Sequence, residues 1–273
     1  MSSNLSRKLI TLSLAIGGLA LPHDSFATAP CAPVPAGLVG WWRLEGNAND
    51  VTTLHNGVAV GGSFVAGEVG QGYTPANVGD GILVPDAPTL NPQQFTLDAW
   101  VRLDALPGYN VALVWKGNAA GADISSPFGL GIYGVTGGPP ALAGLPFLTI
   151  GTGTSEQEID SSTLAPLGPF FHVAATADGT MLSLYLNGQL VASAPQTVTP
   201  VASGFPLQIG GVTLPGALNP GPAVIDEVEI HDVAATAAEI LAIYEAGPAG
   251  KCADGAVPVE SSTWGGLKAR FAR

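Results

Sequence analysis

Glycine and proline interrupt this chain so often that it has no room for long helices. The 273 residues include 37 glycines and 23 prolines, and both residue types break helices and mark turns. Between them lie short runs rich in β-branched and aromatic residues, which is the pattern of strands bounded by turns. Because 47% of the residues are hydrophobic and only 11% are charged, the composition favours a large buried core over disorder.

Several segments have the composition of strands. The predicted strands are Leu38–Arg43, Gly81–Val84, Phe95–Leu103, Val111–Lys116, Phe128–Tyr133, Leu145–Ile150, Phe170–Thr176, Met181–Leu186, Gln189–Ser193 and Ala223–His231. Phe95–Leu103 alternates apolar and polar residues, as expected of a half-buried strand. Asp178-Gly179 and Asn187-Gly188 are hairpin turn signals, so the strands around them should form an antiparallel meander. No helices alternate with the strands, which excludes a parallel βαβ sheet.

One helix is predicted, at Ala237–Ala246. Thr236 and Glu239 have the spacing of a capping box, and Gly247 suits the end of the helix. Three segments rich in glycine and proline are expected to be long loops: Gly117–Pro127, Gly134–Gly144 and Gly210–Pro222.

The first residues are typical of a secretory signal peptide. Arg7 and Lys8 precede an apolar run, Leu9 to Leu21, that is too short to span a membrane. Small residues then favour cleavage after Ala27, with Ala29 as the alternative, which makes residues 1–27 the signal peptide. An uncleaved anchor helix is the competing interpretation. We expect a protein that is secreted, either extracellular or in the cell envelope.

The only two cysteines, Cys31 and Cys252, lie near the two ends of the predicted globular region. An exported chain folds under oxidising conditions, so we expect them to form a disulfide. Two unrelated free thiols are the alternative. A bond would place the two ends of the domain within about 7 Å of each other.

The charge balance excludes two classes of partner. The net charge is −12, and removal of residues 1–27 takes away two basic residues and one acidic residue, leaving −13. Such a chain is not expected to hold nucleic acid, or to attach to a membrane through a basic patch. The C-terminal tail, residues 253–273, ends in a basic and aromatic segment that resembles short tails of exported bacterial proteins. A sorting role and a tail without function both remain open.

Several motifs together resemble the laminin-G-like (LamG-like) jelly rolls of the concanavalin A-like lectin/glucanase superfamily. They are the run from Gly37 to Trp42 with Glu45 to Asp50, the strand Phe95 to Val101, His172 to Thr176 with Asp178-Gly179, Leu184 to Gly188, and Asp226 to Ile230 followed by the short helix. The resemblance covers about residues 31–252. It implies an all-β jelly-roll sandwich of two antiparallel sheets with one short C-terminal helix. It does not specify a function, because the superfamily contains lectins, adhesion modules and glycosidases.

Four residues are candidate ligands of a structural calcium ion, which the resemblance implies. Asp50 and Asp226 match the expected positions, and Glu45 and Asn56 lie in or beside the same turn-rich segment as Asp50. Carboxylates, Asn side chains and backbone carbonyls are the oxygen ligands that Ca²⁺ takes. The alternative is that Asp50 caps a turn and Asp226 lies at the surface.

The tryptophans allow two interpretations. Trp41 and Trp42 are adjacent, so in a strand one points inward and the other outward. The outward one either stacks on a sugar or is covered by the C-terminal segment. Trp100 and Trp115 are expected in the core.

Catalysis has little support in the sequence. Glu156, Glu158 and Asp160 alternate and would point to one side of a strand. Glycoside hydrolysis needs two placed carboxylates, but the order of these three differs from that of the superfamily's glucanases. We expect a solvated edge strand and no enzyme activity. The predicted function is a lectin-like domain that binds a glycan or another surface ligand. The alternatives are a structural or adhesive envelope protein without a sugar site, and a diverged glycoside hydrolase.

Overall fold

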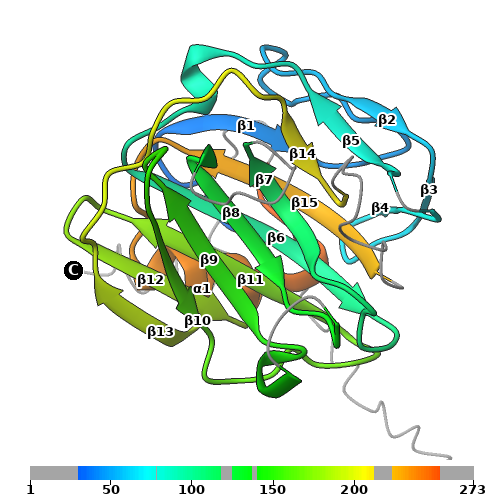
Figure 1. Ribbon diagram of the computed structural model, residues 1–273. Helices are drawn as coiled ribbons and strands as arrows, with labels where there is room; N and C mark the ends of the chain where they lie inside the picture. Colours follow the sequence, from blue (N-terminus) through cyan, green and yellow to red (C-terminus); the bar gives the residue numbers. More distant parts are fainter. Residues whose placement is uncertain (1–29, 78, 118–124, 137–139, 212–222, 253–273) are drawn as a thin grey trace, which may run out of the picture.

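Two antiparallel sheets packed face to face make up the protein, as the computed structural model shows (Figure 1). The structure describes residues 30–77, 79–117, 125–136, 140–211 and 223–252. The signal peptide predicted at residues 1–27 and the tail at residues 253–273 lie outside the described residues. Parts of the three predicted loops lie outside them too.

The larger sheet has eight strands within the described residues. Its order is β13 (Gln189–Pro195), β12 (Met181–Leu186), β11 (Phe170–Ala177), β6 (Phe95–Leu103), β15 (Ala223–His231), β4 (Gln71–Thr74) and β3 (Ser63–Ala66), with β1 (Leu38–Trp42) also paired to β15. The turns at Asp178-Gly179 and Asn187-Gly188 join β11, β12 and β13, which confirms the predicted meander.

The smaller sheet has seven strands in the same part of the chain. Its order is β10 (Glu156–Asp160), β9 (Pro146–Gly151), β8 (Phe128–Ile132), β7 (Val111–Lys116), β14 (Leu207–Ile209), β5 (Gly81–Val84) and β2 (Val58–Val60). The sheet therefore ends at β10 on one edge and at β2 on the other.

The core lies between the two sheets and is built from alternating side chains. In β6, Phe95, Leu97, Ala99 and Val101 point inward and are fully buried in this core. The alternation predicted a half-buried strand, yet Asp98 and Trp100 on the opposite face of β6 are also buried. A further layer must therefore cover the larger sheet from outside.

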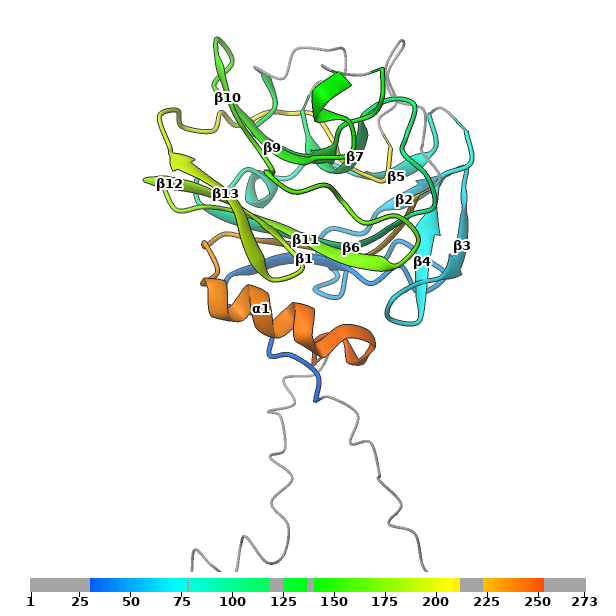
Figure 2. The ribbon, with the colours of Figure 1, turned by 90° about the horizontal axis from the view of Figure 1, so that it is seen from below.

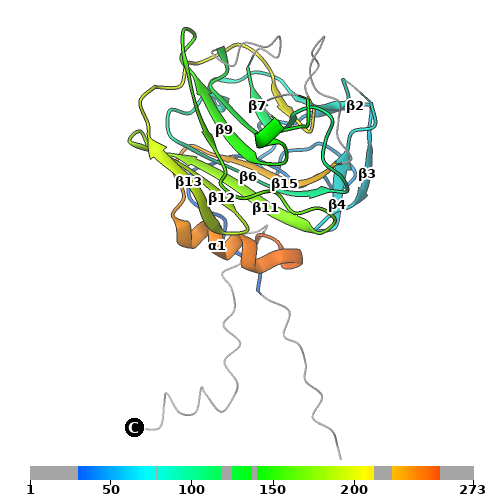
Figure 3. The same cartoon turned by 60° about the horizontal axis from the view of Figure 1, so that its bottom comes forward.

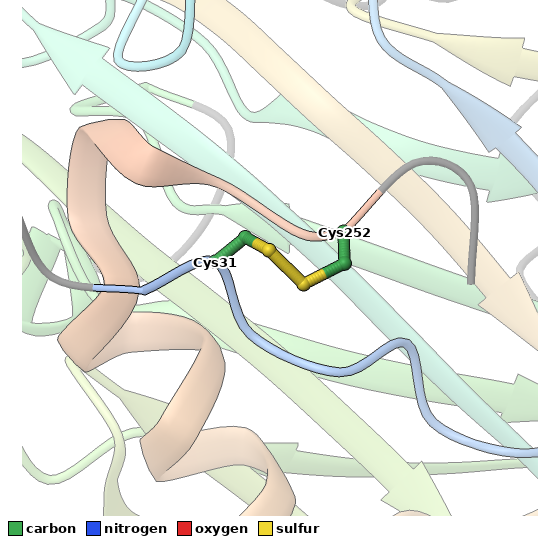
Figure 4. The surroundings of a disulfide bond; sticks show 2 residues. All are labelled: Cys31 and Cys252. Carbon is green, nitrogen blue, oxygen red and sulfur yellow. A yellow bond between two sulfur atoms is a disulfide. The ribbon is translucent and has the colours of Figure 1, made fainter. Parts of the chain in front are cut away.

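That further layer is the helix α1 (Ala237–Ala246) together with the two ends of the domain (Figures 2 and 3). The predicted capping box begins the helix: Thr236 accepts from the Glu239 backbone, and the Glu239 side chain accepts from the Thr236 backbone. Cys31 and Cys252 are bonded beside α1, with Cα atoms 5.1 Å apart (Figure 4). The predicted disulfide is therefore confirmed.

A bulge in β15 positions a group of acidic residues. The register of β15 against β6 shifts between Asp226 and Glu229, and Glu227 adopts a positive φ of 52°. On its other edge β15 pairs with β4 before this point, at Ile225, and with β1 after it, from Val228 onward. The side chain of Asp226 is thereby brought to the place where β1 and β4 meet β15.

Candidate functional site

The outer face of the larger sheet is covered by α1, and its side chains contact the helix. Ile240 of α1 packs with Ala174 and Tyr185 of the sheet. Trp100 stacks on Tyr244 of α1, with ring centroids 5.9 Å apart. Trp100 is therefore buried, but beneath the helix rather than between the sheets. The helix thus covers this part of the face.

A buried ionic network lies under the C-terminal end of the domain. The Lys251 Nζ atom is 3.5 Å from a carboxylate oxygen of Asp98 and 3.5 Å from one of Glu229. Burial opposes the charged form of Lys251, but the carboxylates outweigh this cost and raise the pKa of the ammonium. His231 lies 2.8 Å from Glu229, and although burial opposes protonation, this carboxylate raises the pKa of the imidazole. These acids neutralise buried cations and so have a structural role.

The outward tryptophan of the first strand is Trp41, and it is covered. Trp42 points into the core, whereas the Trp41 Nε1 atom donates to Glu227 at 2.9 Å. The Lys251 ammonium lies 5.7 Å from the centre of the Trp41 ring. Of the two interpretations of the outward tryptophan, covering by the C-terminal segment is the one the structure bears out.

The outer face of the smaller sheet lies on the opposite side of the molecule from α1 (Figure 2). One cross-strand row on this face runs through Gln208, Trp115, Gly129, Thr149 and Glu158, which are register partners on five adjacent strands. A side chain at Gly129 would meet the Trp115 ring at 2.3 Å. The indole therefore lies directly over the glycine, between its own strand and Thr149.

Two side chains of this row carry polar atoms without a partner. The indole nitrogen of Trp115 and the hydroxyl of Thr149 are buried and make no hydrogen bond within the protein. A buried polar group without a partner costs roughly 1–3 kcal/mol. The residues that carry these two groups are the register partners of Gly129 on its two neighbouring strands.

The carboxylates of β10 border this row and are exposed. Glu156, Glu158 and Asp160 point to one side of an edge strand, as the alternation in the sequence predicted. The Tyr133 hydroxyl contacts both Glu158 and Asp160, the latter at 3.1 Å. Burial and the two carboxylates raise the pKa of Tyr133. The phenol therefore stays protonated and remains a hydrogen-bond donor beside these carboxylates.

An aromatic cluster completes this face. Tyr133 packs on Phe147, with ring centroids 4.4 Å apart, and Phe147 lies 6.5 Å from Trp115. A side chain at Gly131 would meet the Phe147 ring at 2.7 Å. Trp115 was expected in the core, but it belongs to this separate cluster on the outer face.

Asp50 and Asn56, two of the predicted calcium ligands, have other partners. The Asp50 carboxylate accepts from the backbone nitrogens of Trp41 at 2.9 Å, Thr52 at 3.1 Å and His55 at 3.0 Å, and from the Thr52 hydroxyl. The Asn56 side-chain oxygen accepts from the Asp50 nitrogen at 2.9 Å. Both side chains thus organise the turn after β1, which is the alternative that the sequence left open for Asp50.

Asp226 and Glu45, the other two predicted ligands, flank a different turn, the one between β3 and β4. Asp226 Oδ2 accepts from Val69 at 2.9 Å, and Glu45 Oε2 accepts from Gln71 at 3.1 Å. Asp226 is buried rather than at the surface, and its Oδ1 atom has no partner. Burial, helped by the charges of Glu227 and Glu45, raises the pKa of Asp226 to about 8.

The donor set around Asp226 fits calcium. A buried carboxylate oxygen without a partner and a second carboxylate on the same turn are hard oxygen ligands of the kind that Ca²⁺ prefers. No cluster of three or more His, Cys, Asp or Glu side chains arranged for a metal occurs among the described residues. A calcium ion here would therefore depend on Asp226, Glu45 and backbone oxygens, with Asp50 and Asn56 shaping the neighbouring turn.

Thr149 and Tyr133 were not expected to have a role from the sequence. Neither belongs to a motif, and Thr149 is one polar residue in an apolar strand. A signal was nevertheless present in β8, where Gly129 and Gly131 alternate with Phe128, Leu130 and Ile132. Alternate glycines leave one face of a strand without side chains, which indicates that another group approaches that face closely.

Comparison with known proteins gives the family. The family model of the concanavalin A-like lectin/glucanases superfamily matches residues 75–241. No curated protein matches the sequence of this chain.

Similar solved structures include enzymes and binding domains. Trypanosoma rangeli sialidase in complex with sialic acid aligns with a TM-score of 0.58 at 22% identity, over 80% of this chain and 36% of the sialidase chain. Domain 4 of AbnA, a GH43 extracellular arabinanase from Geobacillus stearothermophilus in complex with arabinotriose, aligns with a TM-score of 0.58 at 18% identity, over 75% and 97% of the two chains. The binding domain of Paraclostridial Mosquitocidal Protein 1 aligns with a TM-score of 0.55 at 14% identity, over 72% and 48%. This chain thus corresponds to about a third of the sialidase. At these identities the similarity establishes the fold alone.

The protein has two curved antiparallel sheets packed face to face, and a disulfide joins the two ends of the domain. This arrangement and the strand order define a jelly-roll β-sandwich of the concanavalin A type. With a family model matched over more than half of its length, the chain belongs to the concanavalin A-like lectin/glucanase superfamily. The resemblance drawn from its sequence motifs is confirmed.

Proposed function

We propose that this protein is a secreted, non-catalytic domain that binds a glycan on the outer face of its smaller sheet. The observation that carries the proposal is the pair of buried polar groups without partners, Trp115 Nε1 and Thr149 Oγ1, in one row with Glu158. Sugar hydroxyls both donate and accept hydrogen bonds, so a glycan supplies what each of these groups lacks. Aromatic rings beside polar groups are the usual composition of a small-molecule site.

The similar structures add support of a general kind. The arabinanase domain was solved with arabinotriose and the sialidase with sialic acid. Both ligands are sugars, which supports a sugar as the ligand of this fold. The position of the proposed site rests on the residues of this chain alone.

The substitution Thr149→Val tests the proposal. Valine has nearly the same shape but lacks the hydroxyl, so we expect the free protein to become more stable by about 1 kcal/mol. The affinity for the glycan, measured by calorimetry after a screen on a glycan array, should fall severalfold. The Thr149 hydroxyl has a hydrogen-bond partner only when the glycan is bound. Its removal should therefore raise the stability of the free protein and lower the affinity for the glycan.

Thr96→Val is the matched control. The Thr96 hydroxyl lies on the larger sheet, where it donates to the Val233 carbonyl at 2.7 Å and accepts from the Ala235 nitrogen at 2.7 Å. This variant should lose roughly 1–3 kcal/mol of stability without a change in glycan affinity. If Thr149→Val binds every glycan of the array as wild type does, the proposed site is wrong.

We further propose that the domain does not hydrolyse glycans. Glu156, Glu158 and Asp160 lie on an exposed edge strand, and their order differs from that of the superfamily's glucanases, which need two placed carboxylates. Assays of reducing-sugar release from common polysaccharides should find no turnover. Turnover that disappears in Glu158→Gln would contradict the proposal.

Secretion is part of the same proposal, and the disulfide supports it. A bond between Cys31 and Cys252 is typical of an oxidising compartment. In the described part of the chain, no helix has the length and apolar character needed to cross a membrane. N-terminal sequencing of exported protein should find Thr28 or Pro30 as the first residue, and recovery of intact Met1 would contradict cleavage.

A further inference from the structure

The cations of this domain are few, and all of them are already paired. Between residues 31 and 252 the sequence has 18 acidic residues and only four lysines and arginines, a net charge of −14. The four are Arg43 (3.5 Å from Glu227), Arg102 (3.1 Å from Asp104), Lys116 (2.6 Å from Asp86) and Lys251 (3.5 Å from Asp98). The internal segments that the structure does not describe contain neither lysine nor arginine.

The cation closest to the proposed site is Lys116, the residue after Trp115, and its ammonium is saturated. It donates to Asp86 at 2.6 Å, to the Ser203 carbonyl at 3.0 Å and to the Phe205 carbonyl. An ammonium has three donors, and all three of this one are used. Proteins usually hold carboxylate, sulfate or phosphate groups with arginine or lysine. Among the described residues, the site therefore has no free lysine or arginine to balance the charge of an acidic sugar.

The carboxylates beside the row favour the opposite charge. Glu158 is the register partner of Thr149, and Glu156 and Asp160 stand two residues away on the same side of β10. All three carboxylates are exposed. A ligand ammonium, which carries three donors, can form charge-assisted hydrogen bonds with neighbouring carboxylates of this strand.

We propose that the glycan bound at this site carries free amino groups and that acidic sugars are excluded. The inference rests on the proposed glycan-binding function and specifies its ligand class. The buried, unpartnered groups of Thr149 and Trp115 place the sugar ring in the row, and the β10 carboxylates select the amine.

Three oligosaccharides of equal length test the proposal by calorimetry: a glucosamine hexamer, its fully N-acetylated counterpart and a galacturonate hexamer. The titrations are run at a pH of about 5.5, where the ligand amines carry a positive charge and the galacturonate carboxylates a negative one. The glucosamine hexamer should bind at least about tenfold more tightly than the acetylated one, and the galacturonate hexamer should not bind. The double variant Glu158→Gln/Asp160→Asn should lose this preference.

A second double variant, Asp232→Asn/Glu245→Gln, is the matched control. Both residues are exposed and lie beside or on α1, away from the smaller sheet, and the net charge changes by the same amount. This variant should keep the preference for the amine. Should it lose the preference as the β10 variant does, general attraction to an acidic protein explains the binding and the site assignment is wrong.

The remaining outcomes separate the two proposals. Equal affinity for the amino and N-acetylated hexamers, or binding of the galacturonate hexamer, overturns the ligand class and leaves glycan binding intact. Absence of binding to these oligosaccharides and to every glycan of the array overturns the proposed function itself.

Discussion

At the level of the residue, the sequence identified two aspartates as candidate calcium ligands but did not show which of them has a free oxygen. Asp50 and Asp226 were equally good candidates for calcium because both are acidic residues beside turns. Their surroundings differ: Asp50 accepts hydrogen bonds on both oxygens, whereas Asp226 has an oxygen without a partner. Hydrogen bonds from backbone nitrogens depend on local geometry, which residue type and spacing do not determine. The candidate set was thus predictable, but the division of roles within it was not.

The raised pKa of Asp226, about 8, predicts an unusual dependence of stability on pH. A carboxyl group that binds its proton more tightly in the folded state contributes stability at low pH, and this stability is lost as the pH rises from about 4 to 8. In EDTA, Asp226→Asn should therefore gain in melting temperature over wild type between pH 5 and 8, by roughly 5 °C or more. Calcium should restore the wild type at pH 8 and leave the variant unchanged.

Asp50→Asn is the control for this prediction, since its carboxylate accepts four hydrogen bonds. This variant should lose stability at every pH and should still respond to calcium, because Asp226 is intact. A wild-type melting temperature that does not change with calcium at pH 8 would contradict the calcium site.

At the level of the element, the sequence predicted long strands and missed short ones. The predicted strands all occur, with bounds that agree to within two residues, and β5, β6, β7, β12 and β15 agree completely. The strands β2, β3, β4 and β14 were missed; each has only three or four residues, and among strands this short only the apolar β5 was predicted. So short a segment shows no periodicity, and its conformation is decided by pairing with a neighbour. The helix was predicted correctly because its capping box is a local signal.

That capping box makes a prediction at the same scale. Thr236→Ala removes the side chain that accepts from Glu239 at the start of α1, so the free energy of unfolding, measured in urea, should fall by about 1 kcal/mol. Thr236→Ser keeps the hydroxyl and should stay within a few tenths of a kcal/mol of wild type. An alanine variant as stable as wild type would mean that packing on the larger sheet alone holds the helix.

At the level of the whole molecule, the two ends of the chain close the fold together. Cys31 and Cys252 are 221 residues apart in sequence, and Ala32 pairs with Lys251 beside them. The sequence predicted this closure from two cysteines alone. It did not predict that the bond also holds the Lys251 ammonium among buried carboxylates, because their meeting depends on the path of three separate segments.

The disulfide should therefore contribute much of the stability. Closing a loop of this length is worth roughly 5 kcal/mol in the loop-closure model, so Cys31→Ser/Cys252→Ser should lose about 3–5 kcal/mol in urea unfolding. Lys251→Met, with the disulfide intact, should lose a comparable amount because it leaves buried carboxylates without their cation. A serine variant with the wild-type melting temperature would show that the closure is dispensable.

The central claim is that a glycan occupies the row on the outer face of the smaller sheet, and the indole nitrogen of Trp115 reports on it directly. In ¹⁵N-labelled protein, with the Trp115 signal assigned through Trp115→Phe, titration with the glucosamine hexamer should shift this signal in a saturable way. The indole signals of Trp41 and Trp42, whose nitrogens already donate to Glu227 and to the His55 carbonyl, should stay in place. A Trp115 signal that does not move while the hexamer binds, or a shift at Trp41 or Trp42 instead, would contradict the account.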